Sequence, residues 1–156
     1  MNEASGPRRV VAALDAQGRS AVVADEAVAT LGLGSMKIAQ LWTGVLDAKA
    51  DSHAPVESAS CSFRFEQLAE PAYAMMLAEY GPGLGRDNAG MHFTNTADHF
   101  HVIEGEVVLV LETGDVVLRA GDTGVVRGVT HGWRNDSDTT ARIVTFVLPA
   151  TPAMPS

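Results

Sequence analysis

Three side chains in the second half of this chain have the types and the spacing to do chemistry together. His92, Asp98 and His131 lie within one stretch, residues 92–135, in which short apolar runs alternate with glycine-bearing turns. A carboxylate beside two imidazoles can remove a proton next to a carbonyl group. The same groups form the two-histidine, one-carboxylate ligand set that leaves positions open on a metal ion. Either chemistry requires the three side chains to converge on one cavity.

Convergence requires the chain to reverse between His92 and Asp98. A continuous strand rises about 3.3 Å per residue and would hold these two side chains about 20 Å apart. The segment 95–97 (Asn-Thr-Ala) predicts the reversal, because asparagine tolerates left-handed backbone and hydrogen-bonds locally. His92 and Thr94 would then share one side of the incoming strand. Asp98 would begin the outgoing strand, and His131 would open a later one.

Neighbouring side chains would form the walls of such a pocket. Trp133 shares the strand parity of the second histidine, and Arg127 near the rim can hold a substrate carboxylate through two parallel hydrogen bonds. Structural roles stand beside these. Asp98 could be a buried carboxylate bonded to Thr94 and Thr96, and the second histidine a satisfied core residue. The candidate substrate-binding residues are Thr94, Phe100, Trp133, Arg127 and Trp42.

The second half of the chain has the rhythm of an all-β fold. Short apolar runs end at turn residues at regular intervals, which is typical of an antiparallel sandwich or barrel. Alanines and methionines at 72–80 favour a helix by propensity, but the surrounding rhythm favours a strand. The expected strands are 72–80, 98–103, 106–112, 116–119, 123–127, 131–135 and 141–148.

The first half of the chain is less regular. Runs at 10–14 and 21–24 flank a turn in which Gly18 can take a positive φ, and they predict a hairpin. Residues 44–62 lack periodic pattern and suggest a surface loop that acts as a lid. The remaining expectations are one helical turn at 26–30, a strand at 36–43, a short strand at 61–65 and a connector at 66–70.

Composition narrows the class of protein. The chain has 156 residues, a formal net charge of -8, a pI near 4.9 and one cysteine. An acidic surface repels phosphate backbones and argues against nucleic acid as a partner. No apolar run approaches the roughly 18 residues that span a bilayer, and no secretory signal is evident. We therefore expect a cytoplasmic protein without membrane or nucleic-acid partners and without an internal disulfide.

The length predicts a single domain. We expect a flexible N-terminus at 1–8, N-terminal strands and the lid-like loop at 9–71, a barrel core at 72–148 and a flexible tail at 149–156. The run VVLVL at 107–111 is apolar on both strand parities, which is typical of a strand covered on both faces. A second sheet or a second subunit would supply that cover, and the sequence therefore predicts a homodimer.

The stretch resembles the cupin superfamily over about residues 72–147. The first cupin motif has a glycine, His-x-His, an acidic residue and a later glycine, while the second has glycines, a histidine and an asparagine. The matching positions here are His92, Asp98 and Gly105, then Gly121, Gly128, His131 and Asn135. The resemblance is to small single-domain cupins common in bacteria and in biosynthetic pathways. It implies an all-β, jelly-roll type double-stranded β-barrel, here with an N-terminal strand extension.

The sequence departs from the cupin pattern at the ligands. Thr94 replaces the second metal histidine, Asp98 is one methylene shorter than the usual glutamate, and Arg127 replaces the turn proline. The resemblance implies one divalent metal held by His92, Asp98 and His131. Iron, nickel, zinc and manganese all suit that set. The departures leave a site without metal equally open, and no organic cofactor is expected.

Three functions fit these residues. The first is an enzyme with lyase, isomerase or cyclase chemistry on a small oxygenated carbonyl metabolite, in which Asp98 or His131 is the base and His92 or a metal holds the enolate oxygen. The second is an iron-dependent dioxygenase, and the third is a ligand-binding accessory barrel without catalysis. The sequence does not name the substrate.

Overall fold

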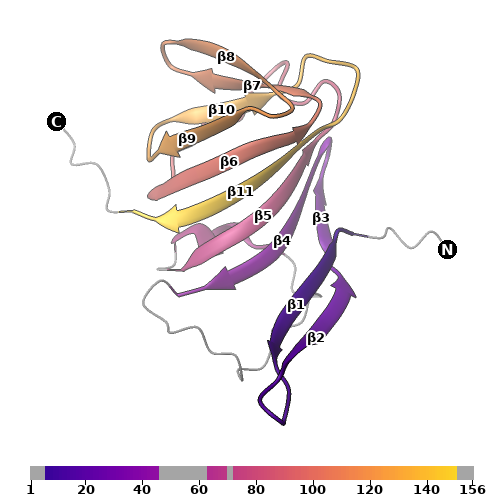
Figure 1. Ribbon diagram of the computed structural model, residues 1–156. Helices are drawn as coiled ribbons and strands as arrows, with labels where there is room; N and C mark the ends of the chain where they lie inside the picture. Colours follow the sequence, from indigo (N-terminus) through magenta and orange to yellow (C-terminus); the bar gives the residue numbers. More distant parts are fainter. Residues whose placement is uncertain (1–5, 46–62, 70–71, 151–156) are drawn as a thin grey trace.

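The computed structural model describes residues 6–45, 63–69 and 72–150, and nearly all regular structure in them is strand (Figure 1). The predicted all-β fold is therefore confirmed. No helix in these ranges is long and apolar enough to cross a membrane. The elements are β1 Arg8–Leu14, β2 Ser20–Ala27, β3 Thr30–Leu33, β4 Met36–Gly44, the 3-10 helix η1 Phe65–Ala69, β5 Tyr73–Tyr80, β6 Thr96–Glu104, β7 Glu106–Leu111, β8 Gly114–Arg119, β9 Thr123–Arg127, β10 His131–Arg134 and β11 Ala141–Pro149.

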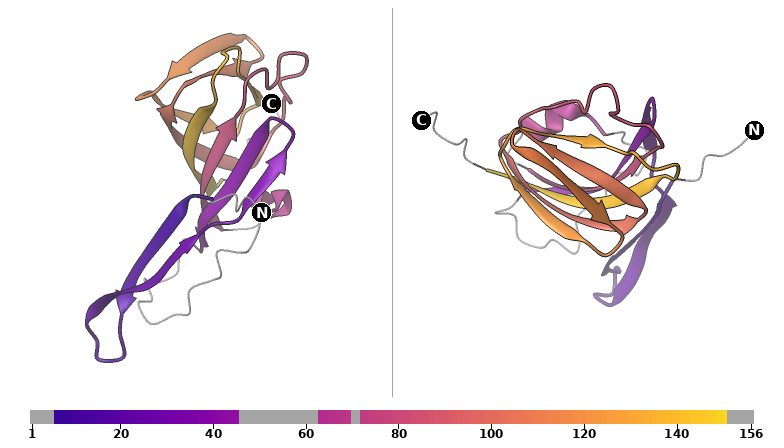
Figure 2. Two further views of the ribbon diagram at one scale, coloured as in Figure 1. Left: turned by 90° about the vertical axis from the view of Figure 1, so that its right-hand side faces the viewer. Right: turned by 90° about the horizontal axis from the view of Figure 1, so that it is seen from above.

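Two antiparallel sheets enclose the core. The larger sheet has the order β3-β4-β5-β11-β6-β9, and the smaller has the order β10-β7-β8. The order places β11, the last strand, in the middle of the larger sheet between β5 and β6. The two sheets together form the barrel, which the right view of Figure 2 shows from above. A third sheet consists of β1 and β2 alone.

Alternation along β11 shows how the sequence builds the core. Ile143 and Val147 are 0% and 3% exposed, whereas Phe146 between them is 44% exposed. Successive side chains of a strand point to opposite faces, so one face of β11 enters the core and the other faces outward. The inward face packs against Phe100 and Val102 of β6.

Glycine is required where this core is tightest. Gly105 joins β6 to β7 with φ of 74°, and a Cβ there would lie 2.7 Å from the carbonyl oxygen of Thr140. Gly124 in β9 leaves room for the ring of Phe100, which lies 2.3 Å from the position that a Cβ would occupy. Any larger residue at either site would push the turn or the ring away.

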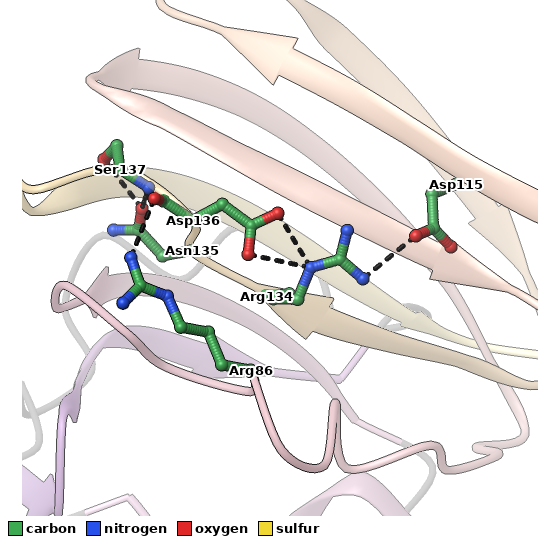
Figure 3. Close-up of polar contacts among 6 residues, drawn as sticks. All are labelled: Arg86, Asp115, Arg134, Asn135, Asp136 and Ser137. Atoms are coloured by element: carbon green, nitrogen blue, oxygen red, sulfur yellow. Dashed lines mark hydrogen bonds and ion pairs between the residues drawn. The ribbon is translucent and has the colours of Figure 1, made fainter.

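A polar network fixes the end of β10 (Figure 3). Asn135 is fully buried and donates hydrogen bonds to the carbonyl oxygens of Tyr80 and Thr139, each at 2.8 Å. Its side-chain oxygen accepts from the backbone and the hydroxyl of Ser137. Asn135 thus ties β10 to the end of β5 and to the turn that leads into β11.

Two expectations for the first half are wrong. The helical turn at 26–30 is absent, because β2 continues to Ala27 and β3 begins at Thr30. Val28 between them is 1% exposed and packs on Ala39 of β4, so sheet packing overrides the local preference. The short strand at 61–65 is absent over its described part, where Phe63 is a single core anchor and η1 begins at Phe65.

Other expectations for the first half are confirmed, and some concern residues outside the described ranges. The predicted hairpin at 10–24 and the strand at 36–43 are confirmed as β1–β2 and β4, and the connector at 66–70 is mostly η1. The ambiguous segment 72–80 is the strand β5, paired on both sides by β4 and β11. Residues 46–62 of the expected lid, the first five residues and most of the expected tail lie outside the described ranges.

The hairpin of β1 and β2 projects away from the barrel (Figure 2). Its base rests on β4, where the Arg9 guanidinium lies 5.6 Å from the ring centre of Trp42 and donates to the carbonyl oxygen of Leu41. Farther out, Val10 and Val22 are 50% and 62% exposed. The hairpin thus contacts β4 at one end, and much of its remaining apolar surface is exposed to solvent.

The strand β7, whose apolar run suggested a dimer, is covered largely within one chain. Val108 of β7 is 3% exposed within a single chain, so this strand finds much of its cover without a partner. The outward face of the larger sheet is less covered. One row across five strands carries Val125, His99, Phe146, Met75 and Trp42. Val125 and Phe146 in this row are 48% and 44% exposed, respectively.

A second row on this face, separated from the first by one row, alternates in charge. Lys37, Glu79, Arg142 and Glu104 follow one another across four strands. In a two-fold contact the same patch meets itself in reverse. An alternating row can then set each charge against its opposite, and the apolar row would supply an apolar core for the contact. We therefore expect a second copy of this chain to cover the face.

Light scattering during size-exclusion chromatography tests the dimer. The wild-type protein should elute with the mass of two chains, and Phe146→Asp should elute as one chain, because two buried charges would meet near the two-fold axis. Phe93→Asp is the matched control, since Phe93 is 49% exposed but lies away from this face. A wild-type protein that stays monomeric at high micromolar concentration would contradict the proposal.

The Asn135 network makes a prediction about stability. Asn135→Ala removes the donor to the buried carbonyl oxygen of Tyr80 and the acceptor for the amide and hydroxyl of Ser137. We expect the free energy of unfolding to fall by about 3 kcal/mol. Urea denaturation measures this change. Asn95→Ala removes an exposed amide of the same type and should change stability by less than about 0.5 kcal/mol. Equal effects of the two substitutions would show that the network contributes nothing.

Candidate functional site

His92 and His131 form the centre of the site. Their backbones exchange two hydrogen bonds, of 2.8 Å from His92 N to His131 O and 3.0 Å from His131 N to His92 O. The ring centres lie 4.4 Å apart. The predicted convergence of the two histidines is thus present, and cross-strand pairing produces it.

The chain reverses at the start of the segment 95–97, where the sequence predicts it. The bend falls at Asn95, and Thr96 already opens β6. Thr96 pairs with Pro149 of β11, and the amide of Ala150 donates to the carbonyl oxygen of Asn95 at 2.9 Å. Pairing with β11 draws Thr96 into the larger sheet and leaves residues 93–95 to make the turn.

Backbone carbonyls fix the tautomer of both imidazoles. Nδ1 of His92 lies 2.8 Å from the oxygen of Gly90, and Nδ1 of His131 lies 2.9 Å from the oxygen of Val129. A carbonyl oxygen only accepts, so each Nδ1 carries a hydrogen. In the neutral ring Nε2 then has the free lone pair, ready to accept a proton or to bind a metal.

Burial keeps His131 neutral. Its side chain is 2% exposed, and removal from water lowers the pKa of the imidazole below 6.5. The nearby ring of His92 lowers the pKa further, while the hydrogen bond to Val129 and the charge of Asp98 act in the opposite direction. His131 is therefore an uncharged base at neutral pH.

Asp98 reaches the same region from β6. One of its carboxylate oxygens, Oδ1, is buried and has no hydrogen-bond partner among the described residues. The bonds expected from Thr94 and Thr96 are not formed, since these two hydroxyls bond each other at 2.7 Å. A buried carboxylate oxygen without a donor is costly. It marks a place where a proton or a ligand group would be stabilised.

Tyr80 is a site residue that the sequence did not reveal. Burial, and then the charge of Asp98, raise the pKa of its phenol well above the usual range. Its ring stacks on Trp133 with centres 5.6 Å apart. The sequence placed Tyr80 at the end of a strand but could not say which face of that strand is inward. Its parity with Ala74 and Ala78, both buried, becomes a signal only once the sheet is known.

A cavity of about 940 Å³ opens beside the histidine pair. His92, Thr94 and Trp133 line it, whereas Asp98 and His131 are not among its described lining residues. The exposed imidazole of His92 therefore faces the cavity, with the buried imidazole of His131 behind it. Apolar side chains from η1, β4 and the segment 84–93 form most of the remaining wall.

The other predicted substrate-binding residues lie apart from the cavity lining. Phe100 is 3% exposed and meets the edge of Trp133 at 5.3 Å, so it supports the wall from behind. Arg127 is exposed at the end of β9 and is not among the described lining residues. Trp42 lines a separate groove of about 450 Å³ against the β1–β2 hairpin.

A β-bulge explains the position of Trp42. Ile38 of β4 faces the core. Trp42 lies four residues later, so an unbroken strand would place its side chain on the same side. The register of β4 against β5 shifts between Gln40 and Trp42, which makes Leu41 an extra residue. A bulge turns the following side chain to the other face of the sheet.

The metal expected from the resemblance meets only part of its ligand set. In both imidazoles Nδ1–H donates to a backbone carbonyl oxygen and leaves Nε2 free. Metal-binding histidines show the same arrangement. In the described residues, however, no group of three or more His, Cys, Asp or Glu side chains is placed to hold an ion. The Thr94 hydroxyl is engaged with Thr96. The arrangement as it stands does not fit a metal held by three protein ligands.

Comparison with known proteins agrees with the barrel. Residues 76–147 match the family model described as Cupin domain. The solved cupin domain of Cnp3 from Schizosaccharomyces pombe aligns with a TM-score of 0.57 and 13% identity, covering 91% of this chain and 87% of that one. At this identity the likeness shows the fold alone.

Curated relatives match a shorter segment. Phomopsin biosynthesis cluster protein C' of Diaporthe leptostromiformis is 44% identical over 64 residues, which is 40% of this chain and 34% of that protein. The cupin-domain-containing oxidoreductase srdB of Neurospora crassa is 38% identical over 63 residues, 40% of this chain and 31% of that protein. The matches thus span about a third of these relatives.

The neutral, buried state of His131 predicts a pH dependence of stability. Its folded pKa lies below the unfolded value of 6.5, so between the two values the unfolded chain binds more protons. Stability is therefore fully present above about pH 6.5 and falls as the pH drops below it. Urea denaturation at about pH 7.5 and about pH 5.5 should show a larger loss for wild type than for His131→Gln. His99→Gln, an exposed control, should keep the wild-type loss.

Proposed function

Because this chain belongs to the cupin superfamily, with its cupin domain at residues 76–147, we propose that it is an enzyme of small-molecule biosynthesis that moves protons on an oxygenated carbonyl metabolite. One observation carries the proposal. A tautomer-fixed imidazole faces the cavity, and a neutral imidazole and a buried carboxylate lie behind it. Such a group can take a proton from carbon at neutral pH.

We assign the base role to His92 in place of Asp98 or His131, the bases expected from the sequence. It is the histidine that lines the cavity, and its Nε2 accepts while its Nδ1–H is held by Gly90. A neutral His92 in this tautomer has no hydrogen to offer an enolate oxygen. It instead takes the proton from the carbon next to the carbonyl, and the C–H electron pair becomes the enolate.

The enolate oxygen needs a donor from another residue. The side-chain oxygen of Asn88 accepts from the amide of Gly90 at 2.9 Å, which leaves its NH₂ group available at the cavity wall. The hydroxyl of Thr94 is a second donor when it accepts the hydrogen bond from Thr96, because its own hydrogen is then available. Return of the proton from His92 to a different carbon gives isomerisation. Its transfer to a β-hydroxyl, which leaves as water, gives dehydration. Attack of the enolate on a second carbonyl gives ring closure.

Asp98 and His131 act as positioning residues. The carboxylate of Asp98 favours positive charge on the imidazole of His131, because opposite charges at short range stabilise the charged form. His131 holds the backbone of His92 and keeps a second positive charge away from it while neutral. Together they position the group that meets the substrate.

An iron-dependent oxygenase is the second candidate. The observation in its favour is the name of one relative, a cupin-domain-containing oxidoreductase, together with two free Nε2 atoms in this chain. Iron would supply oxygen activation, and His92 and His131 are the residues that would hold it. No third protein ligand is placed beside the two histidines in the ranges that the structure describes, and this argues against the candidate.

Proton exchange tests the proposed chemistry without knowledge of the natural substrate. The wild-type protein should speed exchange of deuterium from heavy water into the α-positions of 2-tetralone, a neutral ketone, as followed by NMR. His92→Gln should slow this exchange by about 100-fold or more. Asp98→Asn and His131→Gln should shift its pH profile, and the outward-facing His99→Gln should behave as wild type.

Metal analysis of the same samples separates the two candidates. Exchange that survives exhaustive chelation supports acid–base chemistry. Stoichiometric iron, with oxygen uptake lost on chelation, would overturn it in favour of the oxygenase. Exchange that is equal in wild type and His92→Gln would remove His92 from the mechanism.

A further inference from the structure

The cavity beside His92 has a composition that selects its ligand. We infer that it takes an uncharged, largely apolar ring compound with oxygen at one end, and that it rejects carboxylates, phosphates and ammonium groups. This inference names a substrate class and so rests on the proposed function of the same site. Its volume of about 940 Å³ is at the upper end of sites for small molecules.

Aromatic and aliphatic side chains dominate the wall. Phe65 of η1 and Phe93 flank the opening and are 53% and 49% exposed, which leaves two large apolar surfaces in contact with water. Leu84 and Met36 continue the apolar wall toward the core cluster. An apolar ligand would remove these surfaces from water, and that burial would drive binding.

The polar side chains described in the wall are one imidazole, one hydroxyl and two amides. They belong to His92, to Thr94, and to Asn88 and Asn95. None of the described lining residues is Lys, Arg, Asp or Glu. A charged ligand would lose its hydration on entry and gain no ion pair, whereas carbonyl and hydroxyl groups find both donors and acceptors.

Nearby arginines are directed elsewhere. Arg86 belongs to the segment that lines the cavity, but its guanidinium donates to the carbonyl oxygen of Asp136 at 2.8 Å (Figure 3). Arg134, two residues after Gly132 in β10, is bound to the carboxylates of Asp115 and Asp136. Neither of these two arginines is placed to pair with a charged ligand in the cavity.

Trp133 places the ring of the ligand. It lines the cavity, and Tyr80 stacks behind it while Phe100 meets its edge. A side chain fixed on two sides presents a rigid aromatic face. His92 and Thr94 lie in the same lining, so a ligand ring on Trp133 can direct its oxygen to these polar groups.

Three compounds with one ring system test the inference: 2-tetralone, tetralin-2-carboxylate and 2-aminotetralin. Trp133 reports binding directly, because the chain has two tryptophans and Trp42→Phe removes the other. In this background 2-tetralone should quench the fluorescence saturably. The carboxylate and the ammonium compound should bind about tenfold more weakly or worse. A carboxylate that binds as tightly as the ketone would overturn the inference.

Matched variants locate the binding. Phe93→Ser and Phe65→Ser each remove an apolar wall and should weaken ketone binding by about threefold to tenfold. Val22→Ser removes an exposed apolar side chain from the β1–β2 hairpin, outside the described cavity lining, and should leave it unchanged. Equal effects of all three would place the ketone elsewhere and sink the inference.

The outcome is separable from that of the proposed function. His92→Gln should still bind 2-tetralone, since the apolar wall is intact, while it loses proton exchange. Binding without exchange in the wild type would end the acid–base proposal and leave the ligand class standing. Exchange with stronger binding of the carboxylate compound would do the reverse.

Discussion

The two backbone hydrogen bonds between His92 and His131 hold the candidate site together. They join a segment with no other strand pairing to the first residue of β10, and so close the end of the barrel beside the cavity. Each imidazole is then anchored by the carbonyl two residues earlier in its own chain segment. The site therefore owes its geometry to main-chain bonds, and side-chain substitutions at its walls need not move the two rings.

The strand rhythm predicted the barrel well because period-two burial is a strong constraint. Segment 72–80 shows its strength, since methionines and alanines that favour a helix became β5 between two partner strands. The helical turn at 26–30 failed for the same reason, because Val28 gains more from burial on Ala39 than from local helix. In both segments, packing in the sheet therefore outweighed local helix propensity.

The candidate site was predictable in part. Spacing brought His92, His131 and Asp98 to one region, since a reversal was the only way for the three to meet. Spacing could not show that Trp42 faces outward, because a bulge at one residue exchanges the two faces of a strand. Spacing also could not show which of the two imidazoles is buried more deeply. His92 lines the cavity while His131 is buried behind it, and that difference decides which imidazole can touch a ligand.

Thr94 and Asp98 together explain why this site suits neutral chemistry. Thr94 bonds Thr96 and offers no imidazole, so the donors around the cavity are uncharged. Asp98 keeps a buried oxygen without a partner among the described residues, and its charge acts on the imidazole of His131 and the phenol of Tyr80. Proteins break such local rules mainly where function requires it. The negative charge favours the protonated form of His131, so in the proposed reaction it would help to stabilise a proton that reaches the imidazole pair.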